Sequence, residues 1–414
     1  MLKCSVVTPS HDTRYLVELH DTLRTQTYNN WEWVLYLNGD ACGKGRSLPQ
    51  QILDDSRITV WEEPGNGLVG SIKKAAFSKA TGDVLVEVDH DDLLTADCLA
   101  EIMDGFADPK VGFVYSDIAK LSDDFTPYRK ELGWTYRSFD WGEKQLIAMN
   151  SFPPDAGSLA FIWYSPDHVR AWRREVYEKV GGHNEDLSIL DDQDLMCRTY
   201  LHTKFHYVQK VLYVYRITGE NTWLKRNKQI QEGTVRMYHE YAHALAERDC
   251  ELAGLMKIDL GGGLHPRPGY STIDLEGGDI SWDLNNGIPL NNNSVGVLNA
   301  SHILEHLRNP VHIMAEIHRV LCDGGWAMIE VPSTDGRGAF QDPTHVSFWN
   351  ENSFWYYTQK KQAEFIRNTT TRFQAYRNET MYPSQWWKDA RIPVVRAYLR
   401  AIKSNKNRPH GCYI

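Results

Sequence analysis

Short apolar segments alternate with helical spacing along the first part of the chain. Runs of β-branched and aromatic residues, each bounded by turn residues, predict buried strands at 3–8, 32–37, 57–61 and 83–88. Between them, apolar residues three or four positions apart predict helices at 14–26, 68–80 and 95–107. This alternation predicts a parallel sheet covered on both faces, whose ligands bind beyond the carboxyl ends of the strands. We therefore expect the chemistry to follow Thr8, Leu37 and Val88.

A second α/β series follows a long polar and aromatic helix predicted over 222–250. It begins with LMKIDLGGG at Leu255 and continues with strands at 270–274, 295–299 and 326–331 and a helix at 309–321. No Gly/Ser-rich or Pro-rich linker separates the two series. We therefore predict two α/β domains, 1–250 and 251–414, which pack together through the 222–250 helix.

Length and composition favour the same picture. The 414 residues are too many for one ordinary core, and 42% hydrophobic with 24% charged residues is typical of a globular protein. The net charge of −9 gives no overall field that attracts nucleic acid, so a nucleic-acid partner is not expected. The seven scattered cysteines predict reduced thiols, and we see neither a signal peptide nor an apolar run of spanning length, so we expect a cytoplasmic protein.

One predicted strand ends in several carboxylates. The segment VLVEVDHDD at 84–92 places like charges together, which is costly unless a cation or ligand neutralises them. Asp89 and Asp91 are two positions apart and suit a hard divalent cation, Mn²⁺ or Mg²⁺, that bridges the phosphates of a nucleotide. The alternative is that Asp91 or Asp92 caps the helix that starts near Thr95.

The surrounding motifs resemble family 2 glycosyltransferases, over roughly residues 3–225. Three segments carry this resemblance: the opening VVTPSHD, then LRTQTYNNWEWVLYLNGD, and the run from Pro64 through ATGD to Asp-x-Asp-Asp. The resemblance implies a GT-A fold and metal ligation by Asp89 and Asp91. It also implies a nucleotide-sugar site formed by Thr8, Pro9, Asn38, Asp40, Asn66, Lys73, Asp89 and Arg216. The family usually has an acidic residue where Asn38 stands, so the base of the donor is left open.

A further motif of the same family lies downstream. The segment RAWRREVYEKVGGHNEDLSILDDQDLMCRTYL places Asp192, with Asp191 beside it, where the family keeps its catalytic base. Displacement of a nucleoside diphosphate with inversion requires deprotonation of an acceptor hydroxyl. Crowding with Asp194 would raise one pKa in this group. The alternative is a helix N-terminus carrying favourable negative charge.

Two features bear on how the donor and acceptor would be held. Thr218 stands where many family members have a histidine that contacts metal or phosphate, so Arg216, Lys225 or Arg226 is a candidate to hold the diphosphate. The 125–170 stretch is rich in aromatic residues, which suit either stacking on acceptor sugar rings or packing in a core. These residues are Trp134, Tyr136, Phe139, Trp141, Trp163 and Tyr164.

The second half resembles class I S-adenosylmethionine-dependent methyltransferases over about 255–357. KIDLGGG, VGVLNASHILEHL, EIHRVL with its following Gly-Gly, and MIEVP carry the resemblance. It implies a Rossmann-like fold and a cofactor site at Asp259, Gly261, Gly263, Asp274, Asp283 and Asn299, with Asp274 on the ribose and Asp283 near the adenine. Only 15 residues separate Asp259 from Asp274, and Pro266 and Pro268 lie between, so the first helix is expected to be short or absent.

Two segments near the end of the chain carry further candidate chemistry. His345, in DPTHVSFWNENSFWYY, is either a base acting on a sugar hydroxyl during methyl transfer or a structural histidine. A basic tail around a short apolar helix is either a contact for an anionic membrane or lipid-linked acceptor or a solvated face. Its charges are Lys388, Arg391, Arg396, Arg400, Lys403, Lys406 and Arg408.

These patterns together predict a bifunctional glycan-building enzyme. An inverting, metal-dependent transferase would move sugar from a nucleotide-diphosphate sugar to a glycan or glycoconjugate hydroxyl, and the second domain would methylate with S-adenosylmethionine. Two alternatives stay open: a transferase that acts on modified DNA bases, and a second domain that only binds.

Overall fold

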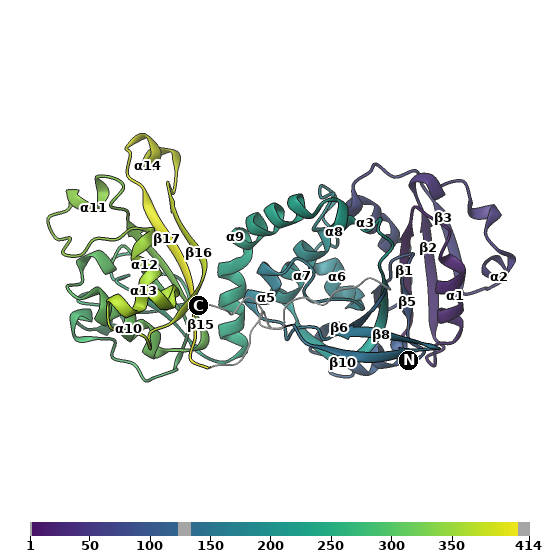
Figure 1. Cartoon of the computed structure of the whole chain (residues 1–414), viewed down its shortest axis with the longest axis horizontal. Coiled ribbons are helices and arrows are strands. Elements are labelled where there is room, and N and C mark those ends of the chain that lie inside the picture. Colours follow the sequence, from purple (N-terminus) through teal and green to yellow (C-terminus); the bar gives the residue numbers. More distant parts are fainter. Residues whose placement is uncertain (1, 123–133, 405–414) are drawn as a thin grey trace. The chain divides into compact units, whose positions relative to one another are not determined.

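The computed structural model describes residues 2–122 and 134–404. The chain divides into two compact units, Met1–Tyr241 and Ala242–Ile414. The helix α9 (Asn227–Leu252) runs across this division, and the predicted boundary near 250 also lies within it. Figure 1 shows α9 as the long teal helix.

The first unit is built on one large sheet. Its main path has the strand order β3-β2-β1-β4-β9-β6-β10-β5. The four strands expected from the apolar pattern are all present and run parallel to one another. They are β1 (Cys4–Ser10), β2 (Trp31–Leu37), β3 (Ile58–Glu62) and β4 (Val84–Glu87).

The rest of this sheet contains several antiparallel pairs beside one parallel pair, which corrects the prediction of a parallel sheet. The strand β9 (Arg170–Arg173) is antiparallel to both of its neighbours, β4 and β6 (Val111–Leu121). β5 (Leu93–Leu94) is antiparallel to β10 (Lys204–Arg216), and β7 (Tyr136–Trp141) forms a hairpin with β8 (Lys144–Met149). Antiparallel pairs need no crossover helix, so the alternation of strands and helices gives no sign of them.

The predicted helices of the first unit are present with shorter bounds. They are α1 (Leu16–Arg24), α3 (Val69–Ser78) and α4 (Cys98–Gly105). α1 buries Leu16, Leu19 and Leu23, the stripe expected from their spacing. The helix expected over 222–250 is interrupted at Arg226, between α8 (Thr222–Lys225) and α9. The remaining helices are α2 (Gln50–Leu53), α5 (Ala156–Phe161), α6 (Arg174–Lys179) and α7 (Asp191–His202).

The second unit has a seven-stranded sheet in the order β13-β12-β11-β14-β15-β17-β16. The first five strands of this path are parallel, and the last two are antiparallel to their neighbours. This order extends the doubly wound 3-2-1-4-5 arrangement and confirms the Rossmann-like prediction. The strands are β11 (Met256–Leu260), β12 (Ser271–Asp274), β13 (Ile280–Ser281), β14 (Val295–Ser301), β15 (Leu321–Pro332), β16 (Phe373–Met381) and β17 (Val394–Ala401).

The helices of the second unit fit the expected pattern with one omission. α10 (Pro310–Val320) is the helix predicted at 309–321, and α11 (Gly338–Gln341), α12 (Glu351–Thr358), α13 (Lys360–Phe365) and α14 (Gln385–Asp389) follow it. Between β11 and β12 the chain forms turns without a helix, as the two prolines predicted. Gly261 adopts a φ of +77°, a conformation that a glycine accepts readily, at the start of this turn segment.

The helix predicted within the basic tail is wrong. Residues 394–401 form β17, which lies between β15 and β16, instead of a helix. The Arg396 guanidinium pairs with Glu330, and buried Arg400 donates to the Gly324 carbonyl, so both charges have partners within the second unit. The apolar residues among these charges were predicted to form a helix, but the β-branched Val394 and Val395 favour a strand. Lys406 and Arg408 lie outside the described residues.

Two other sequence-based expectations concern the whole chain. No helix within the described part is both long and apolar enough to cross a bilayer. Six cysteines are free thiols, as predicted, and Cys412 lies outside the described residues.

Candidate functional site

Two carboxylates at the carboxyl edge of β4 lack a hydrogen-bond partner in any other residue of the described chain. The side chains of Asp89 and Asp91 are half-buried, and neither accepts a hydrogen bond from the side chain or backbone of any other described residue. Burial, with repulsion from Glu87 and Asp91, raises the pKa of Asp89 to about 6 against the attraction of Lys73. Burial also raises the pKa of Asp91. A bound cation would stabilise the charged form of both carboxylates.

The third carboxylate of this segment has a structural role. Asp92 is buried, and its two oxygens accept hydrogen bonds from the Tyr213 hydroxyl at 2.7 Å and the Arg216 amide at 2.6 Å. It therefore fastens β10 to the acidic loop. α4 begins at Cys98 with Asp97 at its N-cap, so the alternative in which Asp91 or Asp92 caps this helix is wrong.

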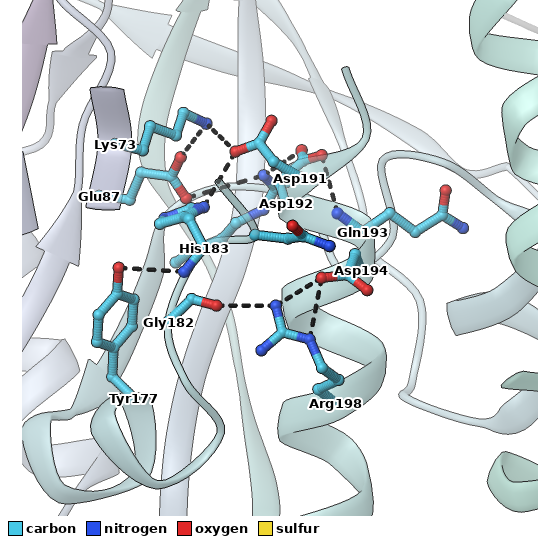
Figure 2. A network of polar contacts seen from close by, with 12 residues as sticks. Lys73, Glu87, Tyr177, Gly182, His183, Asp191, Asp192, Gln193, Asp194 and Arg198 are labelled. Carbon is cyan, nitrogen blue, oxygen red and sulfur yellow. Dashed lines mark hydrogen bonds and ion pairs between the residues drawn. The ribbon is translucent and has the colours of Figure 1, made fainter. Parts of the chain in front are cut away.

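A second carboxylate group lies close by and is neutralised by the chain itself (Figure 2). Glu87 is fully buried in β4, and the Lys73 ammonium from α3 contacts it and also lies 3.7 Å from Asp191. The imidazole Nδ1 of His183 lies 3.0 Å from the same Asp191 carboxylate. Burial alone raises the pKa of Asp191, but Lys73 and His183 outweigh it and hold that pKa below its usual value.

Asp192 differs from its neighbour in exposure and partner. Its side chain is 21% exposed, whereas that of Asp191 is 5% exposed. The buried Arg170 guanidinium from β9 donates to Asp192 Oδ2 at 2.6 Å. Asp194, the third acid of this motif, points to Arg198 and Tyr241 and takes no part in this contact. Asp192 is therefore the acid of this motif that remains accessible.

The two carboxylate groups belong to one site. The Lys73 ammonium experiences the charges of Glu87, Asp89, Asp191 and Asp192 together, which raise its pKa well above the ordinary value against the effect of burial. β4 supplies the first of these acids and precedes the loop with the second, and the N-terminus of α7 supplies the other two. The acids that the sequence placed a hundred residues apart are thus gathered at one sheet edge.

The remaining residues expected at the donor site occupy different environments. Thr8 is fully buried and its hydroxyl accepts the Trp33 indole N–H, so its side chain belongs to the core. Pro9 is half-buried, Asn38 is buried and Asp40 is exposed, at the ends of β1 and β2. Asn66 accepts the Leu68 amide and donates to Ser71, so it shapes the turn before α3.

Arg216 already has protein partners. Its guanidinium donates to the Asp91 carbonyl and to the Glu18 carboxylate, each at 2.7 Å, and lies 4.6 Å from the Tyr15 ring. Thr218, at the position where a histidine was noted as absent, instead accepts the Glu220 amide. Contact between Arg216 and a diphosphate stays a prediction, and it would compete with Glu18.

Two of the aromatic residues considered for acceptor contacts are tied to each other. Trp134 is buried and its indole N–H donates to the Tyr164 hydroxyl. The ring of Trp134 also lies edge-on to Phe152. Trp134 is therefore a core residue.

In the second unit, the cofactor-type residues hold the turn after β11. The buried Asp259 accepts the Asn299 amide group at 2.7 Å and the Arg267 backbone N–H at 3.0 Å. A side chain at Gly262 would place Cβ 2.2 Å from an Asp259 oxygen, and one at Gly263 would place it 2.3 Å from the Glu276 carbonyl. The two glycines are thus required by close contacts within the chain.

The two acids expected at the cofactor's ribose and adenine also contact backbone. Asp274 Oδ2 accepts the Gly263 amide at 2.8 Å, which leaves its other oxygen available. Asp283 is the N-cap of a short 3₁₀ turn and accepts the Asn285 amide at 2.9 Å. His345 donates from Nδ1 to the Ala339 carbonyl at 2.9 Å, and its Nε2 lies 4.0 Å from Glu305.

Comparisons with known proteins agree with this division. Residues 5–180 match the family described as "Glycosyl transferase family 2", and residues 270–329 match "Methyltransferase domain". An uncharacterized protein of Sinorhizobium fredii is 27% identical over 52% of this chain and 22% of its own length. The glycosyltransferase GlyG of Streptococcus pneumoniae is 25% identical over 51% of this chain and 70% of its own length. The chain thus spans less than a quarter of the first relative.

A solved structure with related chain tracing is the mannosyltransferase of Pyrobaculum calidifontis in complex with GDP-Man and Mn²⁺. It is 18% identical, covers 61% of this chain and 74% of its own, and has a TM-score of 0.42. A likeness this distant says nothing about the ligands of the present protein. The two family matches, in their order along the chain, and the two α/β sheets together show that the protein joins a family 2 glycosyltransferase domain to a methyltransferase-type domain.

Proposed function

We propose that the first unit transfers a sugar from a nucleotide-diphosphate sugar to a hydroxyl of a glycan or glycoconjugate. The observation that carries the proposal is the pair of carboxylates, Asp89 and Asp91, that receive no hydrogen bond from another described residue and lie beside a second, neutralised acid group. The family match is the independent support.

A divalent cation suits the first group. Asp89 and Asp91 offer hard oxygen donors of the type that Mn²⁺ and Mg²⁺ prefer. When bound, such an ion would neutralise the charge that develops on the departing diphosphate. The contribution of the chain is to hold both carboxylates at one edge while Asp92 anchors the loop to β10 through Tyr213.

Asp192 is the residue proposed to accept the proton of the acceptor hydroxyl. Its side chain is the more accessible of the two adjacent acids, and Arg170 holds Oδ2 in place. Asp191, proposed alongside it from the sequence, is taken up by Lys73 and His183 and is assigned a positioning role. Deprotonation on the face opposite the diphosphate would give inversion at the sugar carbon.

The test is release of nucleoside diphosphate from UDP- and GDP-sugars with Mn²⁺, Mg²⁺ or a chelator. The proposal expects release from at least one donor that requires both a divalent ion and an added sugar acceptor. Release that is unaffected by chelation would remove the metal from the mechanism. Absence of any release across sugar donors, with the fold intact by circular dichroism, would contradict transferase activity.

For the second unit we propose S-adenosylmethionine binding and methylation of a sugar hydroxyl. The sheet order and the tight Gly262–Gly263 turn at the carboxyl edge of β11 favour this function. Asp274 keeps one carboxylate oxygen for a ribose hydroxyl. Calorimetry with S-adenosylmethionine tests it: heat with about one equivalent is expected, and no heat at millimolar cofactor would instead favour a non-catalytic module.

A further inference from the structure

Three potential metal ligands meet in the second unit, outside the residues expected to bind cofactor. Glu305, His306 and His345 each offer one ligand atom, and these atoms lie within 4.8 Å of one another. Glu305 and His306 belong to a short turn (Leu304–His306) after the carboxyl end of β14, and His345 follows α11. Carboxyl ends of parallel strands are where this class of sheet binds ligands.

The carboxylate of this cluster lacks the hydrogen bonds that burial requires. Glu305 is 2% exposed, and neither of its carboxylate oxygens has a hydrogen-bond partner among residues 2–122 and 134–404. The imidazole nitrogens closest to it are His302 Nδ1 at 3.5 Å and His345 Nε2 at 4.0 Å. A buried carboxylate without hydrogen bonds is costly, and coordination of a metal ion is one way to meet that cost.

Both imidazoles are held in the tautomer that a metal needs. His345 Nδ1 lies 2.9 Å from the Ala339 carbonyl, and His306 Nδ1 lies 3.3 Å from the Thr344 carbonyl. A carbonyl only accepts hydrogen bonds, so Nδ1 of His345 carries the proton and its Nε2 keeps the lone pair. The Thr344 hydroxyl, 3.0 Å from His306 Nδ1, already donates to Asp342 and can accept from His306, which favours the same tautomer there. Imidazoles that ligate metals are oriented in this way by a hydrogen bond to the other ring nitrogen.

The backbone around the cluster is fixed before any ligand arrives. The amides of Val346 and Ser347 both donate to the Glu305 carbonyl, at 2.8 and 3.0 Å. The Ser347 hydroxyl donates to the Leu304 carbonyl at 2.9 Å and accepts the Trp349 indole N–H at 3.1 Å. The segment that carries His345 is thereby attached to the turn that carries Glu305 and His306.

A further oxygen donor lies at the open side of the cluster. Asp342 Oδ2 is 4.0 Å from His345 Nε2, and the Asp342 side chain is 45% exposed. Its other oxygen accepts the amide and the hydroxyl of Thr344, which also contacts His306. Asp342 can therefore approach a bound ion or leave that position to water or substrate.

We infer that Glu305, His306 and His345 form a binding site for a divalent transition-metal ion of the zinc class. Two imidazole nitrogens and one carboxylate oxygen match the donors such ions take, at about 2.0–2.2 Å, and three protein ligands leave a position open for a further oxygen. An ion in that position would lower the pKa of a bound hydroxyl or water. The inference does not depend on glycosyl transfer, because all its ligands lie in the other unit.

The test is Zn²⁺ binding to the full chain, freed of metal with a chelator and titrated by calorimetry. The variants are Glu305→Gln, which keeps the shape of the side chain, and His345→Ala. The matched control is His312→Gln, an exposed histidine of the same unit. We expect the wild type and the control to bind tightly, and each ligand variant to lose at least about tenfold in affinity.

X-ray absorption at the zinc edge identifies the ligands and separates this site from an all-oxygen site elsewhere. The inference expects about two imidazole nitrogens around Zn²⁺ in the wild type and one in His345→Ala, with both proteins folded by circular dichroism. Equal Zn²⁺ affinity in wild type, Glu305→Gln and His345→Ala would overturn the site. A zinc environment without imidazole would overturn it too, and the cluster would then be a proton-transfer or structural group.

Discussion

The first unit holds two groups of acids at the same sheet edge, and the chain treats them differently. Glu87, Asp191 and Asp192 are met by Lys73, His183 and Arg170. Figure 2 shows Lys73 and His183 beside Glu87 and Asp191. Asp89 and Asp91, which directly follow β4, receive no such partner from the described chain. One group is neutralised within the fold and the other is left for something that binds.

The difference appears in the direction of the pKa values. Lys73 and His183 hold the pKa of Asp191 below its usual value, whereas burial and like charge raise that of Asp89 to about 6. Acidic residues that lie close together can therefore have different roles. Each acid has to be assigned by its own contacts, and the candidates for a metal and diphosphate are those whose carboxylate forms no hydrogen bond or ion pair with another described residue.

The largest expected effect is on catalysis by the accessible member of the neutralised group. Asp192→Asn should reduce sugar transfer by roughly 10²–10⁴-fold, the usual contribution of a general base, while donor affinity changes little. Transfer assays with saturating donor and calorimetry with the nucleoside diphosphate measure the two effects. The control is Asp186→Asn, an exposed acid shortly before α7. Near-normal transfer by Asp192→Asn would remove this residue as the base.

Lys73 and Lys74, adjacent in α3, allow a buried ion pair to be compared with an exposed one. Lys73→Met leaves Glu87 and Asp191 without their shared cation and should lower the free energy of unfolding by about 3–5 kcal/mol. Lys74→Met removes only an exposed contact with Glu185 and should change it by less than about 1 kcal/mol. Urea denaturation of both variants measures the difference. Equal losses would mean that the buried group is not held by Lys73.

Glu32, at the opposite edge of the sheet, extends the comparison to pH. Burial alone raises its pKa, but hydrogen bonds from Lys3, Ser5 and Thr81 outweigh burial and lower it to about 2. Because the folded pKa is depressed, the stabilisation is complete above the ordinary value of 4.5 and is lost as the pH falls towards about 2. The shift corresponds to at most about 3 kcal/mol.

Glu32→Gln should accordingly remove part of the acid sensitivity of the first unit. The stability gap between wild type and variant, from urea denaturation at about pH 7 down to about pH 3, should be largest at the upper end and shrink with falling pH. A gap that stays constant over this range would show that Glu32 acts through packing and not through its charge.

The smallest expected effect is on the stability of the unpartnered group. Asp91→Asn removes a carboxylate that makes no hydrogen bond to another described residue and is repelled by Asp12. The free energy of unfolding should therefore change by no more than about 0.5 kcal/mol. Asp191→Asn is the contrast, since it weakens contacts with Lys73 and His183. Thermal denaturation of the two variants compares them directly. A large loss in Asp91→Asn would mean that this acid stabilises the fold.

The sequence predicted well where burial alone decides the outcome. The strands β1 to β4 and the apolar stripe of α1 were placed from hydrophobic spacing, and the absent helix after β11 from Pro266 and Pro268. Predictions failed where contacts with residues distant in the sequence decide the local structure. The segment of β17 was predicted to be a short apolar helix, but it forms a strand in which Arg396 and Arg400 contact Glu330 and the Gly324 carbonyl, both on β15.

The candidate site shows the same limit. Asp89 and Asp192 were found by motif, but Arg170 and His183 were missed, because nothing local marks which residue will face a distant acid. Glu305 lies within the quoted segment VGVLNASHILEHL and His345 was named as a candidate base, yet their approach depends on backbone hydrogen bonds between segments forty residues apart. Spacing along the chain carries no signal for such a meeting.

The central claim is that Asp89 and Asp91 hold a divalent cation which in turn holds a diphosphate. The most direct measurement is calorimetric binding of UDP and GDP with Mn²⁺ and with a chelator, in the wild type and in Asp91→Asn, with His306→Ala as a control for metal bound in the other unit. The account predicts Mn²⁺-dependent binding of at least one nucleotide in the wild type and in His306→Ala, reduced by about tenfold or more in a folded Asp91→Asn. Nucleotide binding that is equally tight with chelator, or unchanged in Asp91→Asn, would contradict it.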